Sequence, residues 1–221
     1  MSPQVYALLV DATTETLFMV GVSGAVATLL GLPLGVALAV SGRGELLQCL
    51  AFNRIAGLVI NATRSTPFII LVVAIIPFTR LVAGTSIGTR AAIVPLIVAA
   101  TPFIARVVEA AIREVDRGLT EAAAAMGATP FQIIRKVLLP EALPAIILGL
   151  TLAAVSLIGY SAMVGAVGGG GLGDLGIRYG YQRFLPDVMA AVVLVLIVLV
   201  QAVQSGGEAL ARQVNKRNLK T

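Results

Sequence analysis

Long uncharged runs of apolar residues alternate along the chain with short segments that carry the polar and charged residues. The first run has no charge between Glu15 and Arg43, and the runs from Ala142 and from Val188 are equally continuous. A helix needs about 20 apolar residues to cross a hydrocarbon core roughly 30 Å thick. The pattern therefore predicts membrane-spanning helices at about residues 17–40, 56–82, 91–108, 142–167 and 188–207.

The predicted helix over 56–82 has the weakest pattern of the five. Arg64 and Arg80 bracket only Ser65 to Thr79 as an uncharged stretch. Long arginine side chains can reach toward the membrane interfaces from within a helix. We therefore expect one helix over 56–82, with both guanidinium groups directed to its ends.

Composition supports an all-α membrane protein. Of the 221 residues, 58% are hydrophobic and 12% are charged, and the mean hydropathy is +0.97. A β-barrel would show segments of alternating polarity, whereas these runs are apolar on successive residues. A soluble fold has too small an interior for this composition.

Lysine and arginine are distributed unevenly among the connecting segments. Eleven lie in 41–54, 106–139 and 212–221, and four lie in 1–12, 78–90 and 168–187. The positive-inside rule then predicts an external N-terminus and a cytoplasmic C-terminus. The N-terminal residues carry no basic leader, so we expect the first helix to be retained. Because the basic residues are scattered between apolar runs, the net charge of +5 does not indicate nucleic-acid binding.

Several kinds of chemistry are disfavoured. The chain has one cysteine, Cys49, and no histidine, which argues against a disulfide framework and against zinc, haem or histidine-based catalysis. The glycine-rich run 165–176 contains GxGxxG matches at Gly168 and Gly171, but a membrane helix and not a strand precedes them, so we expect a tight external loop. No P-loop is present, so energy for active transport would have to come from another subunit.

The segment from Arg106 to Leu139 is the longest predicted cytoplasmic connection. Thr120 can cap a short helix over 121–126, which Gly127 would end. Thr129, Pro130 and Gln132 form a capping-box pattern at the start of a second helix.

In this second helix, Phe131, Ile134 and Leu138 are expected to share one face. Pro140 and Pro144 are expected to end or kink it where the fourth span begins. From spacing alone, two interpretations of the alanine-rich helix before it stay open, namely docking into a groove of another protein and lying passively on the bilayer.

The pattern Glu121-Ala-Ala-x3-Gly127-x9-Val137-x-Leu139-Pro140 resembles the EAA loop of permease subunits of ATP-binding-cassette (ABC) importers. Val137 stands where that family usually has isoleucine. Other stretches resemble the permease subunits of methionine importers over nearly the whole chain, including Arg64-Ser-Thr-Pro-Phe-Ile-Ile, Pro102-Phe-Ile-Ala-Arg106 and Gly159-Tyr-Ser-Ala-Met163.

This resemblance implies a single type I ABC transmembrane domain over 1–221 in a bacterial inner membrane, with the EAA loop at 117–140. It implies a homodimer, two separate ATPase subunits that bind ATP and Mg, an external substrate-binding protein, and no cofactor or enzymatic activity on this chain. The residues that would couple to the ATPase are Glu121, Ala122, Ala123, Met126, Gly127 and Ala128.

Polar side chains within spans often face a bundle interior. In the fourth span these are Ser156, Tyr160 and Ser161, followed by the flexible thioether of Met163, and both helix packing and a pathway lining would explain them. The spacing of Gly31 and Gly35 allows close helix approach, and we favour packing within the chain over a dimer seam.

Two other transport functions stay open as alternatives. One is an ion-coupled secondary transporter, which commonly places a carboxylate within a span. The acidic residues Glu15, Glu109, Glu141, Asp174, Asp187 and Glu208 are expected at span ends or in loops, which argues against it. The other is an ABC importer permease for a different small polar substrate.

Overall fold

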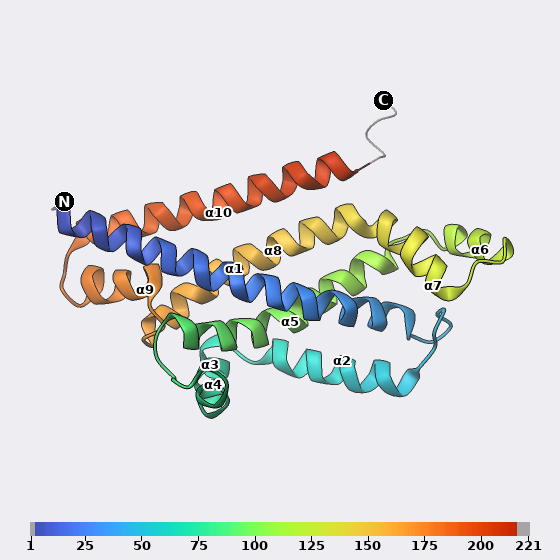
Figure 1. Cartoon of the computed structure of the whole chain (residues 1–221), viewed down its shortest axis with the longest axis horizontal. Helices are drawn as coiled ribbons and strands as arrows, with labels where there is room; N and C mark the ends of the chain where they lie inside the picture. Colours follow the sequence, from blue (N-terminus) through green and yellow to red (C-terminus); the bar gives the residue numbers. More distant parts are fainter. Residues whose placement is uncertain (1–2, 216–221) are drawn as a thin grey trace.

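The computed structural model describes residues 3–215, and within that part every regular element is helical, as the sequence predicts. Four long helices run side by side along the longest axis of the molecule (Figure 1). They are α1 (Pro3–Val40), α5 (Thr89–Arg113), α8 (Leu139–Ala166) and α10 (Pro186–Val214). Each is long and apolar enough to cross a bilayer, α8 together with the turns that precede it.

The expected continuous helix over 56–82 is wrong. This part of the chain forms α2 (Leu50–Ser65), α3 (Phe68–Ala74) and α4 (Ile76–Ala83), and α3 is turned by 105° from α2. Pro67 has no backbone N–H and disfavours a helical conformation in the residue before it, and Thr66 is accordingly extended. If α2 and α3 form one bent span, residues 3–215 contain up to five candidate spans.

The long helices extend beyond the runs that predicted them. Helix α1 includes Asp11 and Glu15, α5 continues to Arg113, and α10 continues to Val214. The sequence placed Glu15, Glu109 and Glu208 at span ends or in loops, and this is wrong, because all three lie inside helices. A helix ends where its terminal backbone groups find other partners, and this point need not coincide with the first charged residue.

Short elements lie at the two ends of the bundle (Figure 1). One end holds α6 (Arg117–Ala125), α7 (Pro130–Ile133) and the turn between α1 and α2. The N-terminal end of α1 and α9 (Gly171–Leu175) lie at the other end. The segments 41–54 and 106–139, which the positive-inside rule assigns to one side, are thus found together.

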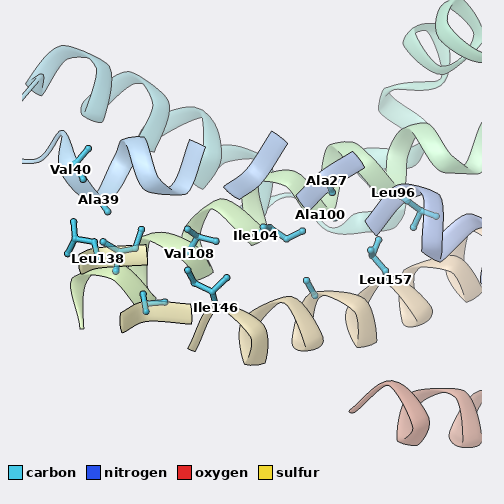
Figure 2. Packing of buried hydrophobic residues seen from close by; sticks show 14 of the residues in the cluster. Ala27, Ala39, Val40, Leu96, Ala100, Ile104, Val108, Leu138, Ile146 and Leu157 are labelled. Atoms are coloured by element: carbon cyan, nitrogen blue, oxygen red, sulfur yellow. The ribbon is translucent and has the colours of Figure 1, made fainter. Parts of the chain in front are cut away.

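The main core lies between α1, α5 and α8 (Figure 2). Its fully buried side chains include Leu96, Ile104, Val108 and Leu157. Small residues allow the helices to approach closely, because a Cβ added at Gly31 would lie 2.9 Å from the Cβ of Ile104. The spacing of Gly31 and Gly35 therefore serves packing of α1 against α5 within the chain, as favoured from the sequence.

Helix α10 lies at the edge of the bundle. It packs on α8, where Gly207 faces Thr151 with no room for a side chain. Its start contributes Val188 and Val192 to a second cluster with Leu172 and Leu175 of α9. This second cluster fixes α9 beneath the N-terminal half of α1.

Candidate functional site

Helix α6 begins earlier than the sequence predicted. Its N-cap is Asp116 and not Thr120, since the backbone N–H of Gly118 donates to Asp116 Oδ1 at 2.8 Å. The hydroxyl of Thr120 instead donates to the carbonyl of Arg117 at 2.7 Å. Aspartate is a preferred N-cap because its carboxylate accepts from free N–H groups of the first turn. Helix α6 is consequently longer than the expected 121–126.

The end of α6 is as predicted. Gly127 has φ of +81°, a left-handed conformation that glycine adopts without a Cβ penalty. The N–H of Ala128 donates to the carbonyl of Ala123 at 3.1 Å, and the N–H of Gly127 donates to that of Ala124 at 2.9 Å. This pair of bonds is a Schellman motif, which satisfies the last carbonyls and reverses the chain.

The predicted capping box at Thr129 is present. Gln132 Oε1 accepts from the N–H of Thr129 at 2.9 Å, and the N–H of Gln132 donates to Thr129 Oγ1 at 3.4 Å. The helix continues from Pro130 to Ala166, so Pro140 and Pro144 do not end it. A π-helical turn, Ile134–Leu138, comes just before Leu139 and Pro140. Such turns accommodate a residue that cannot take part in the regular ladder.

The side chains of the connection face two ways. Ala123, Ile133 and Leu138 are buried in the core. The prediction that Phe131 shares a face with Ile134 and Leu138 is wrong, because Phe131 is 69% exposed. The π-helical turn shifts the hydrogen bonds by one residue between Ile134 and Leu138, so regular helical spacing does not hold across this segment.

Four of the six residues predicted to couple to a partner are exposed: Glu121, Ala122, Met126 and Gly127. Ala123 faces inward, and Ala128 is half-buried. Met126 is 83% exposed, and Leu119 and Phe131 also present apolar surface at this end of the bundle. An apolar patch with an acidic neighbour, on a helix held at both ends, is suited to docking against another protein.

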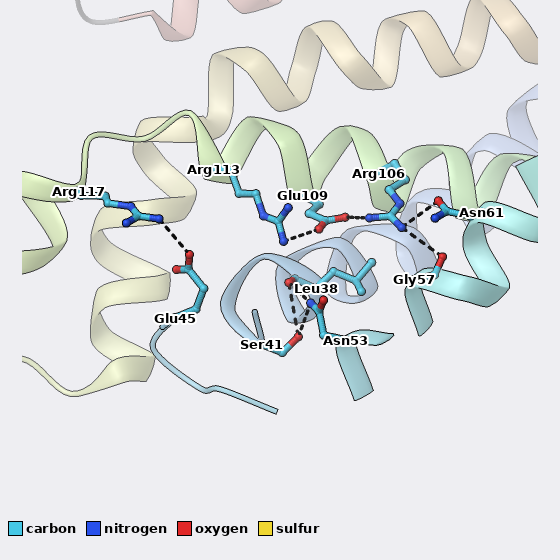
Figure 3. A network of polar contacts seen from close by, with 10 residues as sticks. All are labelled: Leu38, Ser41, Glu45, Asn53, Gly57, Asn61, Arg106, Glu109, Arg113 and Arg117. Carbon is cyan, nitrogen blue, oxygen red and sulfur yellow. Dashed lines mark hydrogen bonds and ion pairs between the residues drawn. The ribbon is translucent and has the colours of Figure 1, made fainter. Parts of the chain in front are cut away.

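An ion-pair network lies where α5 approaches this end (Figure 3). Glu109, which is 3% exposed, accepts from Arg106 at 2.6 Å and from Arg113 at 2.8 Å. The other guanidinium nitrogen of Arg106 donates to the Gly57 carbonyl at 3.2 Å and to Asn61 Oδ1 at 2.9 Å. Sequence reasoning missed this network, although the i, i+3 and i+4 spacing of the three charges on one helix indicates it.

The turn between α1 and α2 also belongs to this end. Asn53 Nδ2 donates to the Leu38 carbonyl at 2.8 Å and to Ser41 Oγ at 3.1 Å, so α2 is held to the last turn of α1 (Figure 3). An exposed ion pair of 3.6 Å joins Glu45 to Arg117 at the start of α6. The base of α6 is thus linked to α5 by the chain and to the α1–α2 turn by this pair.

The pathway candidates on α8 separate into two groups. Ser156, Tyr160 and Met163 follow one another at i, i+4 and i+7 and share one face, on which Met163 is 49% exposed. Ser161 is 2% exposed and donates to the carbonyl of Ile158 at 2.7 Å, so it belongs to the packed side of the helix. The hydroxyl of Ser156 donates to the carbonyl of Leu152 at 2.9 Å.

Tyr160 connects α8 to the broken part of the chain. Its ring stacks on Phe68 of α3 with centroids 4.4 Å apart and planes inclined by 16°. Beside the stack lies a pocket of about 220 Å³ at the α2–α3 break, which also includes Arg64. The sequence predicted that the Arg64 side chain reaches a membrane interface, whereas the structure places Arg64 at this break.

The glycine-rich run also differs from the expected simple loop. After Gly168 and Gly170, both with positive φ, the chain forms α9 and a second π-turn, Gly176–Tyr181. Glu15 accepts from the N–H of Gly171 at 2.7 Å, and Thr16 Oγ1 accepts from the N–H of Leu172 at 2.9 Å. These two side chains of α1 fix the start of α9.

Comparison with known proteins gives consistent matches over most of the chain. Residues 31–217 match the family described as binding-protein-dependent transport system inner membrane component. A probable D-methionine transport system permease protein MetI of Vibrio cholerae is 57% identical over 210 residues, which cover 95% of this chain and 93% of that protein. The corresponding protein of Pasteurella multocida is 46% identical, with 98% and 100% covered.

Solved structures show the same arrangement. An inward-facing conformation of the MetNI methionine ABC transporter contains a chain that superposes with a TM-score of 0.96 at 50% identity, covering 98% of this chain and 100% of that one. A chain of an amino acid ABC transporter superposes with a TM-score of 0.79 at 19% identity, covering 95% of each chain, and this likeness concerns the fold alone.

Proposed function

Because this chain belongs to the family of binding-protein-dependent transport system inner membrane components, we propose that it is the permease subunit of an ATP-driven importer for methionine. The observation that supports methionine as the substrate is the 57% identity to a probable D-methionine permease over nearly the whole chain. The family is one of inner membrane transport permeases, so the role of this chain is to form the pathway and not to hydrolyse ATP. In this proposal residues 1–221 form one type I ABC transmembrane domain.

The assembly would contain two copies of this chain, two ATPase subunits and an external binding protein. The solved structure with 50% identity is that of an ABC transporter, which supports separate ATPase partners. ATP and Mg would be bound by those partners. The exposed apolar side chains along α8 and α10 supply surface for a second copy and for lipid.

Helix α6 would transmit movement from the ATPase. Its exposed positions Glu121, Ala122 and Met126 would contact the ATPase, while Ala123 packs in the core beside Ile133 and Leu138. Because α6 is connected directly to α5 and through α7 to α8, displacement of α6 displaces both long helices. Closure of the ATPase subunits would then open the pathway to one side and close it to the other.

The exposed face of α8 would line the pathway. Ser156, Tyr160 and Met163 lie on this face, whereas Ser161 packs within the chain. In a dimer, two Met163 side chains would approach each other across the pathway and form an apolar constriction that can open when α8 moves.

An ion-coupled transporter is the rival function, and the acidic residues argue against it. Glu109 is buried but neutralised by Arg106 and Arg113, and Glu15 accepts a backbone hydrogen bond. A carboxylate that carries protons or sodium must release its partner during transport.

Reconstitution in vesicles tests the function directly. The chain with its ATPase and binding protein should accumulate labelled methionine when ATP and Mg are present on the ATPase side, and a non-hydrolysable nucleotide should abolish uptake. Uptake by the permease alone, driven by a proton or sodium gradient, would exclude an ABC importer. Uptake of another amino acid with no uptake of methionine would keep the assignment as an ABC importer and reject methionine as its substrate.

The role of α6 can be tested at its terminal glycine. Gly127→Ala places a Cβ at φ of +81°, which costs about 1 kcal/mol and weakens the chain reversal. We expect ATP-driven uptake to fall severalfold while the chain still inserts. Gly206→Ala in α10 is the control, because an added Cβ there has no atom within 4 Å and the helix gains propensity. Equal uptake by the two variants would contradict the coupling role.

A further inference from the structure

The pocket at the α2–α3 break combines charge, hydroxyl groups and aromatic surface. Its volume is about 220 Å³, and its lining includes Arg64, Thr63, Thr66, Phe68, Phe103 and Tyr160. Pockets for drug-sized molecules measure about 300–1,000 Å³, so this one suits a smaller solute. It is distinct from the docking surface on α6 and lies beside the pathway face of α8, which it meets at Tyr160.

Arg64 is an exposed charge in the last turn of α2, directly before the break. The positive-inside rule predicts that Arg54 lies at the cytoplasmic boundary of the membrane. Arg64 is ten residues further along α2, about 15 Å along a helix axis, which is half of a hydrocarbon core roughly 30 Å thick. A charge at that depth is rare and usually faces a bundle interior or a water-filled cavity. Within residues 3–215, no hydrogen bond or ion pair holds the Arg64 guanidinium, in contrast to that of Arg106.

The two threonines of the pocket complement the arginine. Thr63 Oγ1 donates its proton to the Val59 carbonyl at 3.0 Å, and Thr66 Oγ1 donates its proton to the Ala62 carbonyl at 3.1 Å. With their protons engaged, these hydroxyl oxygens can only accept hydrogen bonds from a ligand. The pocket therefore presents a cationic donor beside acceptors, with aromatic rings next to them.

We propose that this pocket is a binding site for the substrate in transit, an inference that rests on the proposed function. Arg64 pairs with the α-carboxylate of a zwitterionic amino acid, and the hydroxyls of Thr63 and Thr66 accept from its ammonium group. The Phe68–Tyr160 stack and Phe103 contact an unbranched apolar side chain. Thioether sulfur packs favourably against aromatic rings, so methionine fits this combination.

The break between α2 and α3 makes the site accessible. The chain turns by 105° between α2 and α3, and the pocket lies at this turn beside Tyr160. Tyr160 belongs both to the pocket and to α8, so movement of α8 changes the shape of the site. Binding and release can thereby follow the movement that α6 transmits.

Substrate protection of an introduced thiol tests the site without relying on transport. Cys49→Ser removes the single native thiol, and Ala99→Cys introduces a reporter that lines the pocket. The assembled complex with its ATPase is labelled with methyl methanethiosulfonate in the presence of L-methionine, norleucine or methioninol. Methionine and norleucine should slow labelling, and methioninol, which lacks the carboxylate, should not.

Arg64→Gln should raise the half-protecting concentration of methionine at least about tenfold, because a hydrogen bond to a charged group is lost. Arg64→Lys keeps the charge without the bidentate geometry. Its half-protecting concentration of methionine should lie between that of the parent and that of Arg64→Gln. The matched control is Arg80→Gln, since Arg80 is exposed like Arg64 but does not line this pocket. Protection in this control should equal that of the parent.

The inference is overturned if methioninol protects as well as methionine, or if Arg64→Gln leaves protection unchanged. Absence of any protection also overturns it. The methioninol comparison needs no arginine variant, so it decides even if Arg64→Gln fails to assemble. Vesicles that take up methionine with ATP but fail these tests would reject this site alone, whereas vesicles without ATP-driven uptake would reject the proposed function itself.

Discussion

Glu109 is the residue whose environment differs most from that of an ordinary surface carboxylate. It is buried between two arginines, and one of these also holds the Gly57 carbonyl and Asn61 of α2. Its negative charge allows two cations to lie close together at the junction of α5 and α2. Such a pair adds little net stability when intact, but the loss of one partner is costly because the other charges stay in place.

Replacing Glu109 with glutamine should therefore destabilise the protein. We expect Glu109→Gln to reduce the free energy of unfolding by about 2–3 kcal/mol, below the range for fully buried pairs because Arg113 is half exposed. Thermal unfolding of the purified complex in detergent would measure this change. Glu114→Gln is the control, since Glu114 is exposed at the end of α5, and it should change stability by less than about 0.5 kcal/mol.

An unchanged melting temperature in Glu109→Gln would show that the two arginines do not need the charge between them. A change of equal size in both variants would assign the effect to the general charge at the end of α5. In neither case would the network hold α2 to α5.

At the scale of elements, the packing of α1 on α5 depends on two glycines. A Cβ at Gly35 would lie 2.5 Å from the carbonyl oxygen of Ala105 and 2.7 Å from the Cβ of Val108, and neither neighbour is the flexible end of a side chain. Overpacking of a well-packed contact costs about 1–3 kcal/mol. The contact lies within one chain, so its loss should not depend on association with a second copy.

Gly35→Ala should accordingly lower the melting temperature of the complex by several degrees, by the same amount at every protein concentration. Gly21→Ala on the same helix has no atom within 4 Å of the added Cβ and should be neutral or slightly stabilising. A loss in Gly35→Ala that grows on dilution would instead place this glycine in a dimer seam.

The sequence predicts the elements whose cause is local. Apolar runs indicate the four long helices, and Gly127 and the Thr129 capping box indicate where the short helices of the α6–α7 connection end and begin. It does not predict the direction of α3, because hydropathy measures transfer into lipid and carries no information on orientation. Thr66-Pro67 was the available signal for the break, and the apolar run around it concealed it.

The candidate site also has a part that the sequence could locate and a part that it could not. The coupling segment is continuous in sequence, so pattern and resemblance could locate it. The Arg106 network and the Arg64 pocket join residues of α2 to residues of α5 and α8 that are far away in the chain. Side-chain spacing on a single helix cannot show which distant groups it will meet.

On the scale of the whole molecule, apolar side chains cover the outside as well as the core. Large exposed residues continue along α10, among them Leu194, Ile197 and Val198, and along α8, among them Leu148 and Leu152. Soluble monomers rarely expose apolar patches of such extent. An inner membrane location accounts for the exposed apolar side chains of α10 and α8. Lipid would cover those of α10, and a second copy would cover those of α8 in the proposed dimer.

The two ends of the bundle carry different charge, which predicts its orientation in the membrane. The predicted cytoplasmic segments hold eleven of the sixteen lysines and arginines, although those at 216–220 lie outside the described residues. Translocation of positively charged segments is disfavoured, so the end with α6 and α7 should face the cytoplasm. Cys49, exposed at the start of α2, provides a native probe of this end.

A membrane-impermeant maleimide should label Cys49 of the permease in inside-out vesicles and leave it unlabelled in spheroplasts. In a Cys49→Ser background, Tyr181→Cys should show the opposite pattern, because Tyr181 is 67% exposed near α9 at the other end. Labelling of Cys49 from outside would place α6 in the wrong compartment for an ATPase. Since the proposed transmission of movement through α6 requires ATP on that side, the result would reject the mechanism together with the orientation.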